Sequence, residues 1–158
     1  KLERHYGLIA KKQPIFEANE RKNCLYRIDD CFFRFWFRFT FKSGYLLEVE
    51  MFDELKGLVE RDYDVFSGQA LEDYFRQKSI GEHRYSRLGG WWDRKGENEI
   101  DCVGENEFHD TLEFVEIKRD ADRIKLDVLR VKAEAFFEKN PEKRSRTVSY
   151  RSFSIKDM

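Results

Sequence analysis

The fold is decided by the stretch Glu99-Ile100-Asp101-Cys102-Val103 and by the run TLEFVEIK, from Thr111 to Lys118, that follows it. Both segments alternate polar and apolar side chains, which is typical of a strand with one buried face. Residues 104–110 between them are polar and predict a turn. Two strands joined in this way pair antiparallel. The sequence therefore predicts a hairpin at the centre of the chain.

The segments around this hairpin complete an α/β pattern. A helix is predicted from Ser67-Gly68 to about Lys78, and a modest alternation follows at 83–88. Gly89-Gly90 is expected to form a turn or bulge, with Trp91-Trp92 starting an extended piece. After the hairpin, Asp120 or Asp122 can cap a second helix. The apolar stripe of that helix is Leu126, Leu129, Ala133 and Phe136.

Asn140-Pro141 ends the second helix, and 147–155 predicts a last strand. From residue 67 onward the expected order is helix, three strands, helix, strand. Such an order favours a mixed sheet flanked by helices.

The N-terminal part divides at about residue 28. Residues 1–28 predict a short helix end at 1–6, a turn at Gly7 and two extended pieces, at 8–10 and 24–28. A helix followed by a two-stranded wing and a plain hairpin both fit this outline. Residues 29–66 predict a helical connector, with a helix at 45–60 and a break at Ser67-Gly68.

The aromatic run at 31–41 is ambiguous between helix and strand. Phe32, Phe33, Trp36 and Phe37 fall at helical spacing, while the odd-numbered phenylalanines also alternate as in a strand. Asp29 and Asp30 can cap a helix, which favours that reading. In either conformation these aromatic side chains are expected in the core.

Composition excludes several classes of protein. Apolar residues make up 41% and charged residues 39% of the chain, a globular balance with a highly charged surface. The net charge of −1 excludes a generic binder of polyanions. No segment resembles a signal peptide, and the most apolar run, 31–41, is too short to span a bilayer. Three cysteines without a CxxC pair argue against disulfides and zinc, and predict a reducing cytoplasm. The start at Lys1 suggests a fragment.

Asp101 and Glu116 are the candidate metal ligands. Alternation places Asp101 on one face with Glu99 and Val103, and Glu116 on one face with Lys118. Two carboxylates brought together on adjacent strands repel each other, and Mg²⁺ or Mn²⁺ would relieve the repulsion. Lys118 can hold a water beside the ion, in an arrangement that suits phosphodiester hydrolysis. Glu72, on the preceding helix, can add a ligand or hold a metal-bound water.

Three further features have alternative interpretations. The hairpin can instead be a solvent-facing one with cross-strand ion pairs. Basic residues predominate at 139–156, so a local basic surface can form there, or the stretch can be a solvated tail. If the domain has a nuclease fold, the candidate contacts to DNA phosphates are Lys143, Arg144, Arg146 and, on the second helix, Lys132. Trp91-Trp92 can stack a base, although core packing is the simpler role.

Residues 68–155 resemble the PD-(D/E)XK nuclease superfamily, whose core is ordered α-β-β-β-α-β. The resemblance is to the archaeal Holliday-junction-resolvase form of the motif. It is carried by Asn98-Glu99-Ile100-Asp101 and by Val115-Glu116-Ile117-Lys118. It implies that Asp101 and Glu116 bind the metal, that Lys118 is the catalytic lysine and that Glu72 is the acid of the first helix. The proline of the motif is replaced by Ile100.

A second resemblance covers nearly the whole chain. The chain resembles the domain of unknown function 234 in four places, which are Tyr26 to Phe39 (YRIDDCFFRFWFRF), Trp91-Trp92, Glu99-Ile100-Asp101 and Glu116-Ile117-Lys118. That domain is similar to the C-terminal part of archaeal and bacterial DEXX-box ATPases, after an AAA-type module and a winged helix. The resemblance implies a winged-helix end at 1–28, a connector at 29–66 and a restriction-endonuclease-like domain at 67–158. No GxxxxGK[ST] run is present, so ATP would bind only in an upstream module.

Two functions follow as expectations. The first is a magnesium-dependent DNA nuclease that uses Asp101, Glu116, Lys118 and Glu72. The second is a catalytically silent module that binds DNA or regulates its own N-terminal ATPase module. The intact acidic set with its lysine favours the first function, and the near-neutral net charge favours the second.

Overall fold

The computed structural model describes residues 7–17 and 23–158, which form two compact units. Of the described residues, one unit comprises 7–12 and 25–70, and the other comprises 13–17, 23–24 and 71–158. The helix end expected at 1–6 lies outside the described residues. The assignment of 1–28 to a winged helix stays a prediction.

The first unit begins with a hairpin of β1 (Ile9–Lys12) and β2 (Leu25–Ile28), where two extended pieces were expected. The aromatic run is helical, as the double aspartate indicates. It forms α1 (Cys31–Phe35), a π-helical turn η1 (Trp36–Thr40) and a 3-10 turn η2 (Phe41–Ser43). Asp30 caps α1 by accepting a hydrogen bond from the Phe33 backbone at 2.9 Å.

The expectation that the run at 31–41 is core holds for only part of it. Phe39 is 3% exposed and packs against Phe35 and Phe66, with ring centroids 5.0 and 5.5 Å apart. By contrast Phe32, Phe33, Trp36, Phe37 and Phe41 are all exposed. This difference arises because a short helix presents only one side to its unit, and the run is aromatic all round.

The predicted break at Ser67-Gly68 is wrong. After α2 (Gly44–Glu48), α3 runs without interruption from Phe52 to Gly81. The Ser67 hydroxyl donates to the Tyr63 carbonyl at 2.7 Å, the back-bond by which serine is accommodated inside helices. The real break is at Glu50, whose φ is +58°. The helix predicted at 45–60 is therefore divided there.

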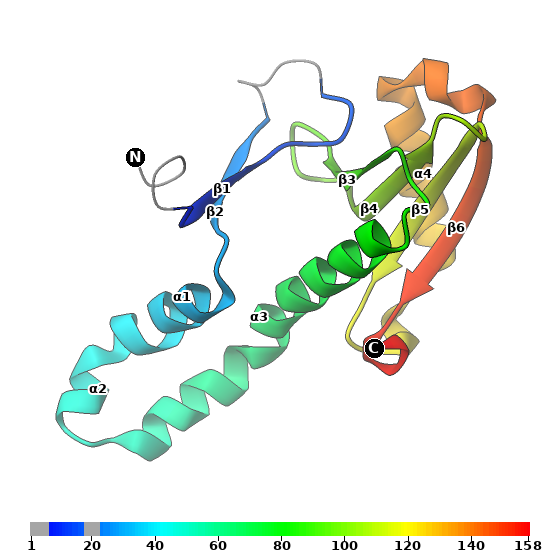
Figure 1. The fold of residues 1–158 in the computed structure, drawn as a ribbon. Helices are drawn as coiled ribbons and strands as arrows, with labels where there is room; N and C mark the ends of the chain where they lie inside the picture. Colours follow the sequence, from blue (N-terminus) through cyan, green and yellow to red (C-terminus); the bar gives the residue numbers. More distant parts are fainter. Residues whose placement is uncertain (1–6, 18–22) are drawn as a thin grey trace. The chain divides into compact units, whose positions relative to one another are not determined.

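The second unit contains a four-stranded sheet in the order β3-β4-β5-β6 (Figure 1). Its strands are β3 (Arg87–Trp92), β4 (Glu99–Asn106), β5 (Thr111–Ile117) and β6 (Thr147–Phe153). The first three pair antiparallel, and β6 pairs parallel to β5. The parallel pair is connected by η3 (Ala121–Arg123), α4 (Leu126–Lys139) and η4 (Pro141–Ser145). A last 3-10 turn, η5 (Ile155–Asp157), follows β6.

Helices cover both faces of this sheet. One cluster joins Leu129, Ala133 and Phe136 of α4 to Val103 and Phe114. The other joins Leu71 and Phe75 of α3 to Val115, Ile117 and Phe153. The rings of Phe75 and Phe153 stack 4.4 Å apart. The unit is therefore α/β with a mixed sheet, and the expected order of helix, three strands, helix and strand is confirmed.

Several expected boundaries move. Trp91-Trp92 ends a strand rather than starting one, and β4 continues to Asn106, which shortens the turn to 107–110. Asp120 caps η3, whereas Lys125 precedes α4 without a side-chain capping bond.

Candidate functional site

The three sharpest candidates lie at one end of the β4–β5 pair. Asp101 is on β4, Glu116 is on β5 and Lys118 follows β5 directly. The last paired residues of this ladder are Cys102 and Val115, so Asp101 and Glu116 come next on the two strands. Beyond that pair the Ile117 amide donates to Asp101 Oδ2 at 2.7 Å. At this end of the ladder the Asp101 side chain, rather than the β4 backbone, therefore accepts a hydrogen bond from β5.

A β-bulge determines where Asp101 points. Gly89 pairs with Val103 while Trp91 pairs with Ile100, so Asp101 and Cys102 both lie opposite Gly90. The expected alternation of Asp101 with Val103 is wrong, because the extra residue interrupts it, whereas Glu99 and Asp101 precede the interruption and keep their alternation. As a result Ile100 and Val103 both join the cluster under α4.

Gly90 permits the close approach at the bulge. A Cβ at this position would lie 3.4 Å from an Arg76 guanidinium nitrogen and 3.5 Å from the Asp101 carbonyl. That carbonyl accepts a hydrogen bond from Arg76 at 2.9 Å. Arg76 on α3 therefore fixes the backbone of the bulge, a role that the sequence did not reveal.

Two lysines neutralise the paired carboxylates. Lys118 Nζ lies 3.2 Å from Asp101 Oδ2 and 2.8 Å from Glu116 Oε1. Lys132 Nζ, from α4, lies 3.4 Å from Glu116 Oε2. Asp101 is 9% and Glu116 5% exposed, so these charges interact in a partly desolvated environment. The two acids are thus brought together, as the hairpin predicts, with Lys118 bridging them.

Glu72 belongs to the same electrostatic cluster. Burial, and then the charges of Asp101 and Glu99, raise the pKa of Glu72 to about 7. Burial likewise raises the pKa of Asp101, although Lys118 and the Ile117 amide oppose the shift. Burial alone would lower the pKa of Lys118, but Asp101 and Glu116 outweigh it and the net shift is upward. Burial therefore disfavours the charged forms of Glu72 and Asp101, and Lys118 opposes this for both carboxyl groups.

The donor set has the chemistry of a site for a hard cation. Carboxylate oxygens are the ligands that Mg²⁺ and Mn²⁺ prefer, and Asp101, Glu116 and Glu72 supply oxygens of this kind. Within residues 7–17 and 23–158, however, no three Asp, Glu, His or Cys side chains are arranged together as metal ligands. In the geometry described, Lys118 rather than a third acid completes the cluster.

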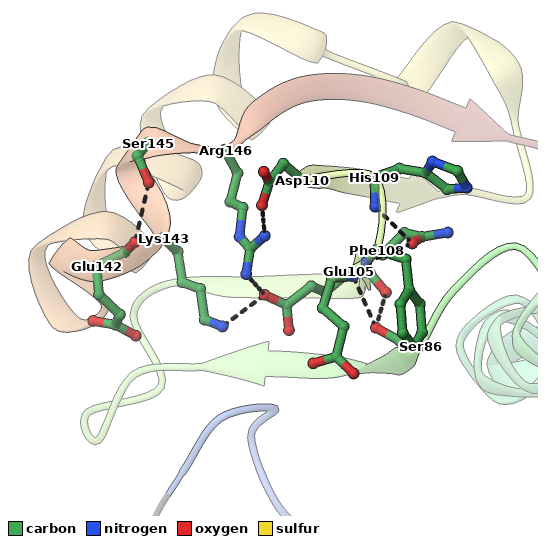
Figure 2. Close-up of polar contacts among 11 residues, drawn as sticks. Ser86, Glu105, Phe108, His109, Asp110, Glu142, Lys143, Ser145 and Arg146 are labelled. Carbon is green, nitrogen blue, oxygen red and sulfur yellow. Dashed lines mark hydrogen bonds and ion pairs between the residues drawn. The ribbon is translucent and has the colours of Figure 1, made fainter.

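The candidate phosphate contacts are engaged within the protein. Figure 2 shows Lys143 and Arg146 converging on Glu105, at 2.6 and 3.3 Å. Glu105 is only 1% exposed, and Arg146 also pairs with Asp110. Arg144 pairs with Glu134 at 2.9 Å on the surface. Together with Lys132, all four predicted basic residues have an acidic partner.

Glu105 is the buried charge that sequence reasoning missed. It extends the alternation of β4 by one step beyond Val103, and that position was expected in a polar turn. A glutamate at a core-facing position signals a buried ion pair. Its partners lie 38 and 41 positions further along the chain, however, and no local pattern links them to it.

The remaining candidates have structural roles. Trp91 is 4% exposed in the core, and Trp92 Nε1 donates to Asn23 at 3.1 Å, which favours packing over base stacking.

The cysteines described are all free thiols. Across the described residues, no helix is long and apolar enough to cross a membrane.

Comparison with known proteins places the chain in a family. Residues 36–132 match the model of DUF234, described as archaeal and bacterial proteins of unknown function. The chain belongs to the DUF234 family. An uncharacterized protein of Methanocaldococcus jannaschii is 30% identical over 135 residues, which is 77% of this chain and 30% of that protein. The chain thus spans less than a third of this relative. No solved structure matches.

The DUF234 match contains the whole Asp101 cluster. Glu72, Asp101, Glu116, Lys118 and Lys132 all lie between residues 36 and 132, whereas Lys143, Arg144 and Arg146 lie beyond the match. The candidate site is therefore part of the segment by which this chain is assigned to DUF234.

Proposed function

We propose that this DUF234 domain is a metal-dependent phosphodiesterase of the PD-(D/E)XK type that acts on DNA. The observation that carries the proposal is the convergence of Asp101, Glu116 and Lys118 at one end of the sheet, at 3.2 and 2.8 Å from the shared ammonium group. The order of elements in the second unit, with β6 parallel to β5, also agrees with the core of a restriction-endonuclease-like fold.

In this proposal Asp101 and Glu116 hold one Mg²⁺ or Mn²⁺. The metal ion, when bound, supplies a water of lowered pKa and stabilises charge on a phosphoryl oxygen. Asp101 is fixed for this role by the Ile117 amide, because a preoriented carboxylate loses little freedom on binding a cation. Glu72 provides a further carboxylate, as a ligand or as an acceptor for a metal-bound water.

Lys118 has the charge and position to act on the attacking water. Its raised pKa keeps it protonated at neutral pH, so it donates hydrogen bonds rather than removing a proton. With a side chain 35% exposed, its ammonium group can reach solvent as well as both carboxylates. We infer that Lys118 orients the water and offsets negative charge that develops on the phosphate.

The second candidate is a catalytically silent module that binds or regulates an N-terminal ATPase module in a longer protein. The observation that favours it is the engagement of the predicted phosphate contacts, since Lys143 and Arg146 are occupied by the buried Glu105. The DUF234 relative is also much longer than the matched part. In this case the Asp101 cluster would be a closed ion-pair network, and ATP would bind only upstream.

A cleavage assay distinguishes the proposed nuclease from the catalytically silent module. The chain is incubated with linear, single-stranded and branched DNA in Mg²⁺ or Mn²⁺. Asp101→Asn is tested alongside it, and so is the control Glu97→Gln, which changes an exposed residue in the 93–98 turn. We expect the wild type and the control to cut at least one substrate, and Asp101→Asn to lose at least a hundredfold in rate. Cleavage that survives in Asp101→Asn refutes the site. Absence of cleavage in every chain favours the silent module.

A further inference from the structure

The first unit contains a cavity of about 370 Å³ that the proposed cleavage site does not use. Four basic side chains line it, from β2 and from the helical run at 31–43. They are Arg27, Arg34, Arg38 and Lys42. The lining also includes the aromatic rings of Tyr26 and Phe37, and no aspartate or glutamate is among the described residues that line the cavity itself. Its volume lies in the range of about 300–1,000 Å³ typical of small-ligand pockets.

The local backbone aligns three of these cations. Arg34, Arg38 and Lys42 are spaced by four residues, and between them Trp36–Thr40 forms a π-helical turn closed by the Phe41 amide on the Trp36 carbonyl. Single π-helical turns are rare and occur frequently at functional sites. A four-residue spacing suits this wider turn, so the three basic side chains follow one side of the run as it passes the cavity.

Arg38, at the cavity rim, shares its acidic partner with a second arginine. Arg38 lies 3.5 Å from Asp62, but Asp62 also accepts two hydrogen bonds from Arg61, at 2.9 and 3.3 Å. One carboxylate therefore serves two guanidinium groups. Arg38 and Lys42 are both exposed, so an anionic ligand can reach them.

The aromatic side chains indicate what kind of anion fits. Tyr26 is 64% and Phe37 43% exposed, and both stand beside the basic groups rather than in the core. Exposed rings of this kind offer flat faces for bases, while arginine and lysine contact phosphates. An acidic peptide would use the cations but leave the rings without a partner.

We propose that this cavity is a binding site for single-stranded nucleic acid, with Arg38 and Lys42 on backbone phosphates and Tyr26 stacked on a base. The proposal is independent of metal-dependent cleavage. Its test is the fluorescence anisotropy of a labelled twelve-nucleotide oligothymidylate in EDTA, with Asp101→Asn as the background chain. Failure of the proposed nuclease activity therefore cannot affect the result.

Two variants probe the two contacts separately. Arg38→Gln/Lys42→Gln is expected to weaken binding about tenfold and to lower the slope of log affinity against log salt by about 1.4, since each single-strand phosphate contact contributes about 0.7. Tyr26→Leu is expected to weaken binding about fivefold or more without changing that slope. The matched control, Lys56→Gln/Lys125→Gln, removes the same charge from two exposed lysines elsewhere and is expected to change affinity less than twofold. Thermal melting checks that every variant is folded.

Competition identifies the ligand. Unlabelled oligonucleotide is expected to displace the probe, whereas thymidine monophosphate, inorganic phosphate and polyglutamate at equal phosphate or carboxylate concentration are not. Displacement by polyglutamate as effective as by oligonucleotide would mean an acidic-peptide site and overturns the proposal. Equal displacement by the mononucleotide or phosphate would mean a small-anion site and also overturns it. Failure of the Asp101→Asn background chain to bind the probe, or variants that bind as the control does, overturns it as well.

Discussion

Lys118 Nζ lies 3.2 Å from Asp101 Oδ2, although Asp101 is on β4 and Lys118 follows β5. This contact crosses the open end of the β4–β5 pair and includes Glu116 at 2.8 Å. It gives the cluster two properties. The carboxylates are held close enough to share one cation, and the cation that they share belongs to the protein. A metal ion that binds Asp101 and Glu116 must therefore compete with Lys118.

Lys118→Met tests this competition. In EDTA the variant is expected to be about 1 kcal/mol less stable than the wild type, because two buried carboxylates lose a partly exposed cation. Added Mn²⁺ is expected to raise its melting temperature more than that of the wild type. Lys125→Met, which removes an exposed lysine at the start of α4, is the control. An equal Mn²⁺ response in the wild type and Lys118→Met would mean that the lysine and the metal do not share ligands.

The raised pKa of Glu72 predicts how the free energy of unfolding of the metal-free protein depends on pH. The pKa of Glu72 is about 7 in the fold against an ordinary value of 4.5, so the folded protein binds more protons than the unfolded chain between these values. Stability is therefore expected to fall as the pH rises from 4.5 to 7, by roughly 2 to 3 kcal/mol from this residue. Urea unfolding of the wild type and Glu72→Gln across this range measures the effect.

Glu72→Gln is expected to lose most of that slope and to keep a smaller one, since burial also raises the pKa of Asp101. Glu97→Gln is expected to behave as the wild type. If Glu72→Gln and the wild type have the same slope, the Glu72 side chain is not held in the cluster.

Glu105→Gln tests the buried ion pairs drawn in Figure 2. The substitution leaves Lys143 and Arg146 partly buried without their shared carboxylate. We expect a loss of about 3 kcal/mol in the free energy of unfolding, measured by urea denaturation. Glu107→Gln, two residues along and exposed, should change stability by less than about 0.5 kcal/mol. A Glu105→Gln chain as stable as this control would show that the pairs contribute nothing to folding.

Gly104→Ala tests a close approach inside the sheet. A Cβ at this position would lie 2.5 Å from two carbons of the Tyr85 ring. The ring is also held by the hydrogen bond of its hydroxyl to Glu113, so it cannot simply move away. We expect a loss of about 1 to 3 kcal/mol in urea unfolding, which largely disappears when the same substitution is made in Tyr85→Ala. If Gly104→Ala lowers the free energy of unfolding equally in the wild type and in Tyr85→Ala, the close approach of Gly104 to the Tyr85 ring is excluded.

The sequence predicted those features that depend on local pattern. Alternation located the two strands that carry Asp101 and Glu116, and the apolar stripe from Leu126 to Phe136 located α4. The break at Glu50 was missed because a left-handed residue is usually glycine or asparagine. The break at Ser67-Gly68 was predicted wrongly because glycine lowers helix propensity by only about 1 kcal/mol, and such a cost is tolerated within a long helix.

The geometry of the cluster could not be predicted in the same way. The bulge at Asp101 arises from pairing with β3, and the Glu105 pairs arise from the return of the chain after α4. Both depend on which distant segments become neighbours. Lys118 was predicted as a water-positioning residue, and its contact with both carboxylates emerges only when the strands are placed side by side.

The most direct test of the central claim is calorimetric titration of the metal-free chain with Mn²⁺ at pH 7.5. We expect one Mn²⁺ per chain for the wild type, and binding at least tenfold weaker for Asp101→Asn and for Glu116→Gln. Glu97→Gln should bind as the wild type does. Wild-type binding that persists unchanged in both variants, or no Mn²⁺ binding by the wild type, would contradict a metal site at Asp101 and Glu116.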